Sequence, residues 1–251
     1  MEQILTNFSA TEVKNYHDHG YVLHNRPLFS AEEFNRLHGI MEEHLADRGN
    51  KRPDELDTPH FHDPRLLDFL LSDTVLDKVE QLIGPNIGLW SSHFICKEPK
   101  TGRRTPWHED SAYWEGRFDQ FDGIVTVWLA LDRSFQGNGC MGVIPGTHAH
   151  GFSEYEKVDN TTNVFEEEIP LSKQELEKVV WFELGQNECS FHDSRIIHGA
   201  NANTSDFRRC GYTMRYFSLD LAYNHDHPKA EGHKMWHCRG ENKGNNPLIY
   251  K

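Results

Sequence analysis

The chain has 251 residues, enough to bury a sizeable core, and its hydrophobic fraction of 37% and charged fraction of 26% are typical of a soluble globular protein. The formal net charge of −13 disfavours nucleic acid and anionic membranes as partners, because both are bound through basic patches. No apolar run approaches the roughly 20 residues that span a bilayer. No basic flank followed by an apolar stretch marks a secretory signal. We therefore expect a cytoplasmic protein that binds neither nucleic acid nor a membrane.

The cysteines are odd in number and scattered, and they include no CxxC pair. Such a set argues against a disulfide framework and against a thiolate zinc site. A reducing compartment fits this usage best. The five positions are Cys96, Cys140, Cys189, Cys210 and Cys238.

Residues 1–85 are expected to form a helical buttress. A serine followed three residues later by an acid, the spacing of a capping box, occurs twice: Ser9 with Glu12, and Ser30 with Glu33. After the second box, apolar residues recur at helical intervals and give one apolar face: Phe34, Leu37, Ile40, Met41 and Leu45.

Residues 86–221 read as a mainly β core, because short runs rich in β-branched and aromatic residues alternate there with turn signals. Many short strands after a helical lead-in predict a β-sandwich or barrel buttressed by the N-terminal helices. An acidic, partly helical segment near 155–180 is expected to be an insertion or lid. The polar tail, 222–251, is left open as a lid, a dimer contact or a disordered end. With no repeat or linker, residues 1–251 form one predicted domain. The expected strands cover residues 87–97, 124–131, 141–144, 188–192 and 212–219.

An HxD element, His108-Glu109-Asp110, is the first candidate for metal binding. On a strand, alternate residues share a face, so His108 and Asp110 point the same way and Glu109 points away. One imidazole and one carboxylate supply two of the three ligands of the facial triad in non-haem iron(II) oxygenases, which leaves positions open for cosubstrate and O₂.

Other histidine clusters have ligand-like spacing but are interpreted as solvated loops, helix caps or structural residues. An HxD tripeptide is weak evidence by itself, and the chain has 17 histidines. The clusters set aside are His60-Phe61-His62-Asp63, His225-Asp226-His227, His148 with His150, and His233 with His237.

The distant partner of the HxD element is expected to be His198, which an arginine pair follows at Arg208-Arg209. A guanidinium near iron would grip the distal carboxylate of 2-oxoglutarate, because its planar fork matches a carboxylate bidentately and stays charged in a pocket. Arg209 shares a strand face with Gly211 and Thr213, so we prefer Arg209 as the clamp and expect Arg208 to lie in a solvated turn.

Three ordered blocks give the sequence a recognisable character. It resembles the phytanoyl-CoA dioxygenase family of iron(II)/2-oxoglutarate oxygenases over roughly residues 8–221, and the NGC…PGTH pattern is quite specific to that family. The blocks are residues 105–110 with Tyr113-Trp114, residues 127–132 continuing into 138–148, and residues 198–203 through Arg209.

The resemblance implies a double-stranded β-helix, a jelly-roll of the cupin-like kind, in which the HxD pair and the distal histidine meet inside the barrel mouth. By position, His108, Asp110 and His198 resemble the family's iron ligands. Related halogenases have a small residue in place of the carboxylate, so the intact Asp110 predicts hydroxylation.

The cosubstrate residues are carried over in the same way. Arg209 resembles the clamp of 2-oxoglutarate, and Trp128 falls where the family has an aromatic residue beside the cosubstrate. His93 falls on a position that touches 2-oxoglutarate in the family. Members often have Met or Gln there, so His93 is either a cosubstrate contact or a core histidine.

The predicted activity is hydroxylation of an aliphatic C–H bond in a small molecule, with Fe(II), 2-oxoglutarate and O₂ consumed to give succinate and CO₂ and with ascorbate in support. If Glu109, Tyr113, Trp114 and Glu115 line the pocket, an amine-bearing or natural-product-like substrate would suit their acid and aromatic groups. Packing at the barrel rim is the other interpretation of these four residues.

Two other functions remain open at this point. A cupin-like metalloenzyme that does not use 2-oxoglutarate would not need Arg209. A non-catalytic binding protein could keep the fold, although the presence of all three ligands disfavours it. A peptidyl substrate is also compatible with the sequence, and the oligomeric state is not indicated.

Overall fold

Antiparallel strands form the centre of the computed structural model, which describes residues 7–251. All strand pairs within its sheets are antiparallel. The strands are β1 (Tyr21–His24), β2 (Leu56–Asp57), β3 (Ile87–Lys97), β4 (Thr105–His108), β5 (Ile124–Ala130), β6 (Met141–Val143), β7 (Glu156–Lys157), β8 (Glu167–Glu168), β9 (Val180–Trp181), β10 (Cys189–Asp193), β11 (His198–Ala200), β12 (Arg209–Ser218) and β13 (Trp236–Arg239).

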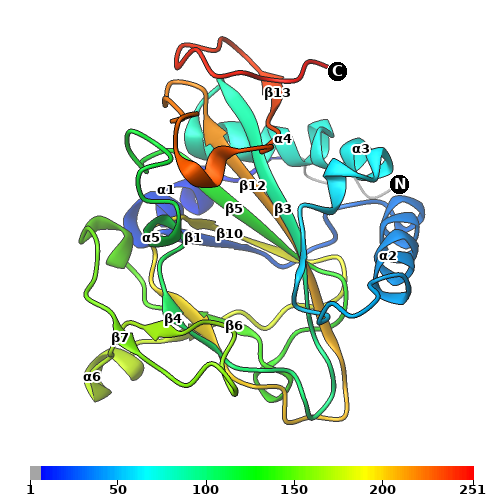
Figure 1. Ribbon diagram of the computed structural model, residues 1–251, viewed down its shortest axis with the longest axis vertical. Helices are drawn as coiled ribbons and strands as arrows, with labels where there is room; N and C mark the ends of the chain where they lie inside the picture. The colour runs from blue at the N-terminus through cyan, green and yellow to red at the C-terminus, as the bar shows by residue number, and fades with distance from the viewer. Residues whose placement is uncertain (1–6) are drawn as a thin grey trace.

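Two main sheets make up the core. The larger has the strand order β1-β10-β5-β12-β3-β13, with β2 added beside β3, and the smaller has the order β4-β11-β6-β9. Figure 1 shows β4 and β6 opposite the strands of the larger sheet. The short hairpin β7–β8 lies within the segment expected to be an insertion.

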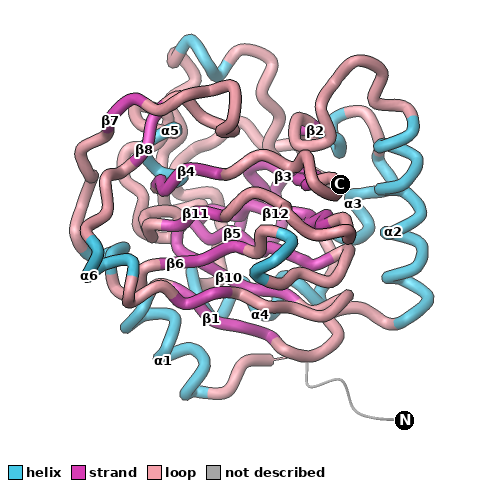
Figure 2. Tube along the Cα trace, turned by 90° about the horizontal axis from the view of Figure 1, so that it is seen from below, coloured by secondary structure: helices cyan, strands magenta, loops and turns pink. Residues whose placement is uncertain are grey.

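Helices cover the outer side of the larger sheet, and Figure 2 shows α1, α2 and α4 around the stacked strands. The capping boxes predicted at Ser9 and Ser30 are both present, each serine accepting from the backbone N–H three residues on. Such a cap stabilises a helix by about 1 kcal/mol. The helices are α1 (Ala10–His19), α2 (Ala31–Ala46), α3 (Leu67–Leu70), α4 (Asp73–Ile83), α5 (Asp110–Tyr113) and α6 (Lys173–Leu176), with single 3₁₀ turns at Pro59–Phe61, Pro64–Leu66, Gln136–Asn138, Thr147–Ala149 and Pro228–Ala230.

Strand β12 shows how the larger sheet divides its two faces. Because successive side chains on a strand point to opposite faces, alternate residues have different surroundings. Tyr212, Met214 and Tyr216 are fully buried in the main apolar cluster, together with the apolar face of α2. Arg209 and Arg215, of the other phase, line a cavity on the inner face. The outer face therefore supplies packing, and the inner face is free to carry chemistry.

The expectation that residues 1–85 are helical is wrong at β1 and β2. Strand β1 begins after Gly20, whose φ of 84° ends α1, and it pairs with β10 along Tyr21–His24. A four-residue strand gains its hydrogen bonds from a partner far along the chain, so local periodicity does not reveal it. Within residues 7–251, no helix combines the length and apolar character needed to cross a bilayer.

A disulfide joins Cys96 of β3 to Cys210 of β12, which contradicts the expectation of no disulfide. The two residues are register partners, with Cα atoms 4.0 Å apart although the residues are 114 positions apart in sequence. Only strand pairing brings them together, so cysteine spacing could not predict the bond. The reducing compartment inferred from that spacing loses its support.

We expect the Cys96→Ala/Cys210→Ala double variant to lower the free energy of unfolding by about 2–4 kcal/mol, because the bond closes a long loop in the unfolded chain. Urea denaturation measures this. Cys238→Ala is the control, because it removes a free thiol and leaves the disulfide intact. Thiol titration of the denatured, unreduced protein should find three free thiols. Five would show that the bond does not form.

Candidate active site

Three potential metal ligands meet where the smaller sheet faces the larger. His108 ends β4, Asp110 opens α5, and His198 begins β11, whose pairing with β4 sets His198 opposite His108. Asp110 Oδ1 lies 3.6 Å from His108 Nε2 and 3.9 Å from His198 Nε2. All three ligand atoms lie within 4.8 Å of one another, and all three residues are buried. Across the described part of the chain, this is the one group of three or more such side chains placed to hold an ion.

Hydrogen bonds at the far side of each imidazole prepare both rings for a metal. His108 Nδ1 lies 2.8 Å from the carbonyl of Pro106, and His198 Nδ1 lies 3.0 Å from the carbonyl of Ile196. A carbonyl only accepts, so each Nδ1 carries a proton, and Nε2 is the ring atom directed toward the other ligands. Burial, followed by the neighbouring His108, holds the pKa of His198 well below its usual value and keeps the ring neutral. The donor set therefore fits a divalent ion with bonds of roughly 2.0–2.2 Å.

The carboxylate is oriented from its other side. Asp110 Oδ2 lies 3.4 Å from Arg215 Nε and 3.4 Å from Thr126 Oγ1, which leaves Oδ1 toward the two histidines. Burial acts to raise the pKa of Asp110, but Arg215 and the histidines outweigh it and hold that pKa well below its usual value. The aspartate is thus an anion before any metal binds.

The sequence predicted Asp110 on a strand, whereas the chain turns into α5 at that residue. The expected direction of Glu109 is nevertheless correct, since its Oε1 accepts from Ser153 Oγ at 2.7 Å, away from the triad. Burial raises the pKa of Glu109. Neither Glu109 nor Glu115 lines the cavity, whereas Tyr113 and Trp114 do.

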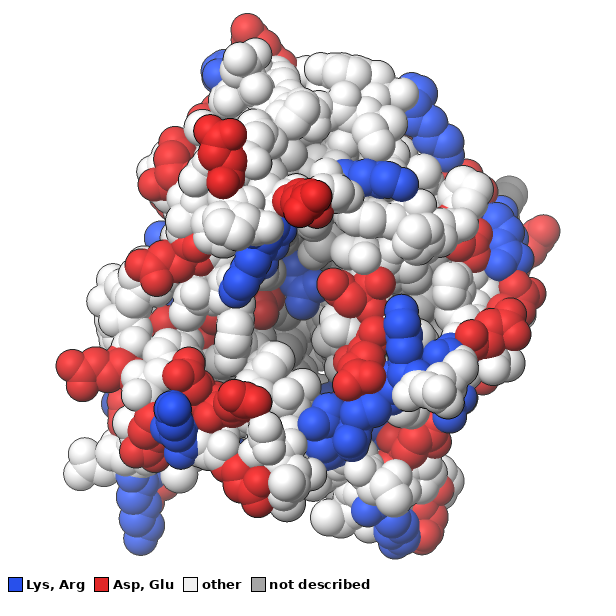
Figure 3. All heavy atoms as spheres, viewed as in Figure 1, with Lys and Arg blue, Asp and Glu red and all other residues white. Residues whose placement is uncertain are grey.

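A cavity of about 520 Å³ opens from the triad to the surface. Figure 3 shows a hollow near the middle of this face, with both basic and acidic atoms around it. One part of the lining, next to β11, contains Arg209, Lys97 and Trp128. Another part, next to α5, contains aromatic side chains and Arg215.

Arg209 is buried in the part of the cavity lining next to β11. Its Nε and Nη2 donate to the carbonyl of Gly139 at 3.1 and 2.7 Å, and its guanidinium carbon lies 5.2 Å from the centre of the Trp128 ring. Burial lowers the pKa of Arg209 to about 10. No acidic side chain in the described chain forms an ion pair with it, so a buried cation here lacks its anion.

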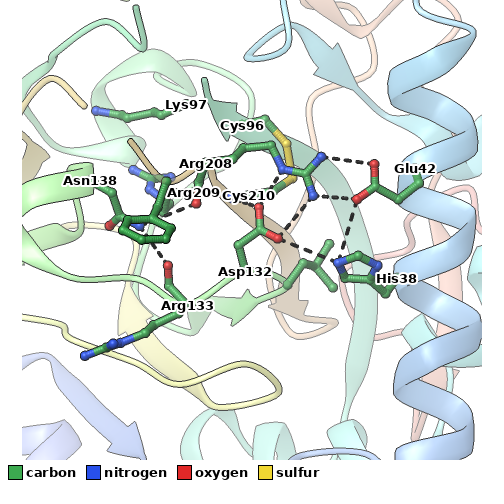
Figure 4. Close-up of polar contacts among 12 residues, drawn as sticks. His38, Glu42, Cys96, Lys97, Asp132, Arg133, Asn138, Arg208, Arg209 and Cys210 are labelled. Carbon is green, nitrogen blue, oxygen red and sulfur yellow. Dashed lines mark hydrogen bonds and ion pairs between the residues drawn. A yellow bond between two sulfur atoms is a disulfide. The ribbon is translucent and has the colours of Figure 1, made fainter. Parts of the chain in front are cut away.

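The neighbouring arginine points the opposite way, as Figure 4 shows. Arg208 Nε donates to Asp132 at 2.7 Å, and its Nη1 donates to Glu42 of α2 at 3.0 Å. Arg208 therefore ties β12 to the helical layer instead of lying in a solvated turn. Strand alternation assigns Arg209 to the cavity.

The other two proposed cosubstrate residues also face the cavity. Trp128 packs so closely over β12 that a Cβ at Gly211 would lie 2.1 Å from its ring, which explains the glycine there. His93 Nε2 is hydrogen-bonded to the carbonyl of Asp54 at 3.0 Å, and burial lowers the pKa of His93 to about 4. The role of each toward 2-oxoglutarate stays a prediction.

Several cavity residues were not identified from the sequence. Phe165 comes from the segment expected to be an insertion or lid, and its ring lies 4.8 Å from that of His108. Lys97 donates from Nζ to the carbonyl of Asn201 at 2.7 Å, and burial, then Arg209, holds its pKa well below the usual value. Arg215 follows Thr213 by two residues, so it could have been found by extending the strand face that Arg209, Gly211 and Thr213 share.

The histidine clusters set aside earlier supply no triad ligand, although His233 lines the cavity and packs on Trp90. His60 Nδ1 is hydrogen-bonded to Ser92 Oγ at 2.7 Å, and His148 Nε2 lies 3.2 Å from the carbonyl of His17. His225 is exposed and packs against Tyr223. None of these histidines joins the triad.

Comparison with known proteins places this site in a family. The family model described as phytanoyl-CoA dioxygenase (PhyH) matches residues 16–211. The chain belongs to the phytanoyl-CoA dioxygenase family. Relatives include the peroxisomal phytanoyl-CoA dioxygenase of Homo sapiens, 28% identical over 166 residues, which are 64% of this chain and 48% of that protein. A probable alpha-ketoglutarate-dependent hypophosphite dioxygenase of Stutzerimonas stutzeri is 23% identical over 84% of this chain and 79% of that protein. The chain spans about half the length of the phytanoyl-CoA dioxygenases it matches.

Solved structures show the same architecture. The non-haem monooxygenase ThoJ superposes with a TM-score of 0.75 at 21% identity, covering 95% of this chain and 86% of ThoJ. EctD from S. alaskensis, solved with 2-oxoglutarate and 5-hydroxyectoine, has a TM-score of 0.71 at 19% identity, covering 86% and 78% of the two chains. The predicted jelly-roll with N-terminal helices is confirmed for this member of the phytanoyl-CoA dioxygenase family.

We expect His198→Ala to abolish stoichiometric binding of Fe(II) or Ni(II), because it removes one of three converging ligand atoms. Metal content after anaerobic loading and desalting measures this. His225→Ala is the matched control, since it removes an exposed histidine of the His225-Asp226-His227 cluster and should leave metal content unchanged. Full metal content in His198→Ala would contradict the assignment.

Proposed function

We propose that this protein is an Fe(II)/2-oxoglutarate-dependent dioxygenase that hydroxylates an aliphatic C–H bond of a small molecule. The observation that carries the proposal is the pairing of two features in one cavity. One is the triad of His108, Asp110 and His198. The other is Arg209, a buried guanidinium bonded to backbone carbonyls and without an acidic partner among residues 7–251.

Iron bound at this triad would supply the activation of O₂ and the oxidation of the substrate. In the overall reaction, the substrate, 2-oxoglutarate and O₂ give the hydroxylated product, succinate and CO₂. One atom of O₂ enters the new hydroxyl group and the other enters succinate. Ascorbate would keep iron reduced between turnovers.

The protein's own contribution is geometry and charge. Two imidazoles and one carboxylate would supply three ligands to the metal and leave further positions open for ligands from the cavity. Arg209 offers a bidentate site for the distal carboxylate of 2-oxoglutarate, and Trp128 flanks that site. Phe165 and Tyr113 pack beside His108, so they shield the metal position from water.

Relatives support this choice without fixing the substrate. The Stutzerimonas stutzeri relative is named for dependence on alpha-ketoglutarate, EvdO2 was solved with 2-oxoglutarate, and EctD was solved with iron. Structures with nogalamycin RO and 5-hydroxyectoine show small organic molecules at related folds. A small-molecule substrate is the proposal for this chain.

Arg209 also separates this proposal from a cupin-like metalloenzyme that does not use 2-oxoglutarate. Such an enzyme has no use for a buried, unpaired guanidinium beside its metal, and that group destabilises the fold unless an anion binds it. A non-catalytic binding protein would not need two imidazoles held in the metal-binding tautomer.

Anaerobic addition of Fe(II) and 2-oxoglutarate is expected to produce a weak visible charge-transfer band. Arg209→Gln should raise the Kd for 2-oxoglutarate at least about tenfold, because a charged bidentate contact contributes on the order of 1.5–3 kcal/mol. Arg208→Gln is the control, since Arg208 bonds to Asp132 and Glu42 on the opposite face. An equal loss in both variants, or no band in the unmodified protein, would contradict the proposal.

Turnover is tested by succinate release from a metabolite panel with Fe(II), ascorbate, O₂ and 2-oxoglutarate. We expect at least one panel member to raise succinate release above the rate without substrate, and to gain one oxygen atom. Asp110→Ala should abolish the stimulation because it removes a ligand. Stimulation by a panel member without any oxygenated product would contradict hydroxylation.

A further inference from the structure

The inner face of β12 carries a second cation that the proposed cosubstrate site does not use. Arg215 lies six residues beyond Arg209, about 20 Å further along the strand at ~3.3 Å per residue. Both residues line the cavity. Arg215 contacts the metal ligand Asp110, whereas Arg209 lies against Trp128. The two guanidinium groups therefore belong to different parts of the same cavity.

The contacts of Arg215 leave most of its hydrogen-bonding capacity free. Its Nε is 3.4 Å from Asp110 Oδ2, and its Nη1 is 3.5 Å from Ser91 Oγ. Both distances are at the long end for N–H···O bonds, and a guanidinium has five N–H donors. The guanidinium carbon lies 5.6 Å from the Trp114 ring centre, so its flat face is also against an aromatic wall.

The charges in the cavity point to a missing anion. A divalent iron and Arg209 together carry three positive charges, and Asp110 with the two carboxylates of 2-oxoglutarate carries three negative ones. Arg215 would then share the carboxylate of Asp110, 3.4 Å away, with the metal, and no other acid among the described residues forms an ion pair with it. Arg117 adds a further cation to the same lining, whereas Arg103 is already paired with Asp54 at 3.1 Å. Glu55 and Asp57 also line the cavity, but both are exposed to solvent around β2, and among the described residues neither forms an ion pair with Arg215 or Arg117.

Aromatic side chains lie beside Arg215 and Arg117. The guanidinium of Arg117 lies 5.0 Å from the centre of the Trp90 ring, and Trp90 and Trp114 pack edge to face at 5.9 Å. Tyr113 and Phe165 complete the wall next to His108. Such a wall buries an apolar body, while the cations beside it bind an acid group.

We propose that the substrate of this site is an amphipathic organic acid whose carboxylate binds Arg215, with Arg117 as a second, outer cation. Its apolar part packs on the wall formed by Trp90, Trp114 and Phe165. This inference rests on the proposed function, since it assumes that iron and 2-oxoglutarate occupy the triad and Arg209. It replaces the amine-bearing substrate expected from Glu109 and Glu115, because neither acid lines the cavity.

The test compares three probes on one skeleton: 4-phenylbutyrate, its primary amide and the corresponding amine, with hexanoate, hexanamide and hexylamine as a second set. Ni(II) replaces iron to prevent turnover, and saturating 2-oxoglutarate keeps the acids away from Arg209. Isothermal titration calorimetry is expected to show at least one acid bound about tenfold more tightly than its amide and its amine.

The arginine variants locate that preference. Arg215→Gln should abolish it and Arg215→Lys should restore it in part, while Arg133→Gln, which changes an exposed arginine outside the cavity, should retain it. Nickel content is measured for every variant, because Arg215 also contacts Asp110. A loss of preference at full nickel content is a substrate effect.

Either of two results would overturn the inference: no acid bound more tightly than its amide and its amine in either set, or an acid preference that survives in Arg215→Gln. If the anaerobic iron and 2-oxoglutarate band forms while one of these results is found, this inference alone fails. If the band does not form, the proposed function fails and the inference fails with it.

Discussion

The hydrogen-bonded pairing of β11 with β4 is the constraint on which the rest of the site depends. It sets His198 opposite His108, although these histidines are far apart in the chain. The turn into α5 brings Asp110 to the same point. Carbonyls of Pro106 and Ile196 fix the ring tautomers from behind. A metal site of this kind is held by backbone geometry before any ion arrives, which limits the cost of organising it.

The two faces of the larger sheet have different roles, because side chains alternate between them along each strand. Residues of β12 in one phase pack with the helices, and those in the other phase reach the cavity. Arg208 and Arg209, where β12 begins, show this most clearly (Figure 4). Arg208 bonds to Glu42 of α2, whereas Arg209 is buried at the cavity and bonds to the carbonyl of Gly139. Arginines line a cavity in a chain whose overall charge is −13, so that overall charge says little about the ligand of an enclosed site.

Much of this arrangement could be predicted from the sequence, because it depends on local patterns or on family blocks. The HxD element, the distal His198 and the phase of Arg209 all follow from such patterns, as do the capping boxes and the bounds of β3. The strand β1, the bond between Cys96 and Cys210 and the contacts of Arg208 depend on which distant segments pair, and no local pattern records that. The same limit hid Ser153 as the partner of Glu109, although the direction of Glu109 away from the triad was predicted.

The measurement that tests the central claim most directly is a crystal structure grown without oxygen in the presence of Fe(II) and 2-oxoglutarate, with anomalous data collected at the iron edge. The account predicts a single strong anomalous peak bonded to His108 Nε2, Asp110 and His198 Nε2. It also predicts that the distal carboxylate of 2-oxoglutarate meets Arg209. A peak elsewhere, or 2-oxoglutarate bound away from Arg209, would contradict it.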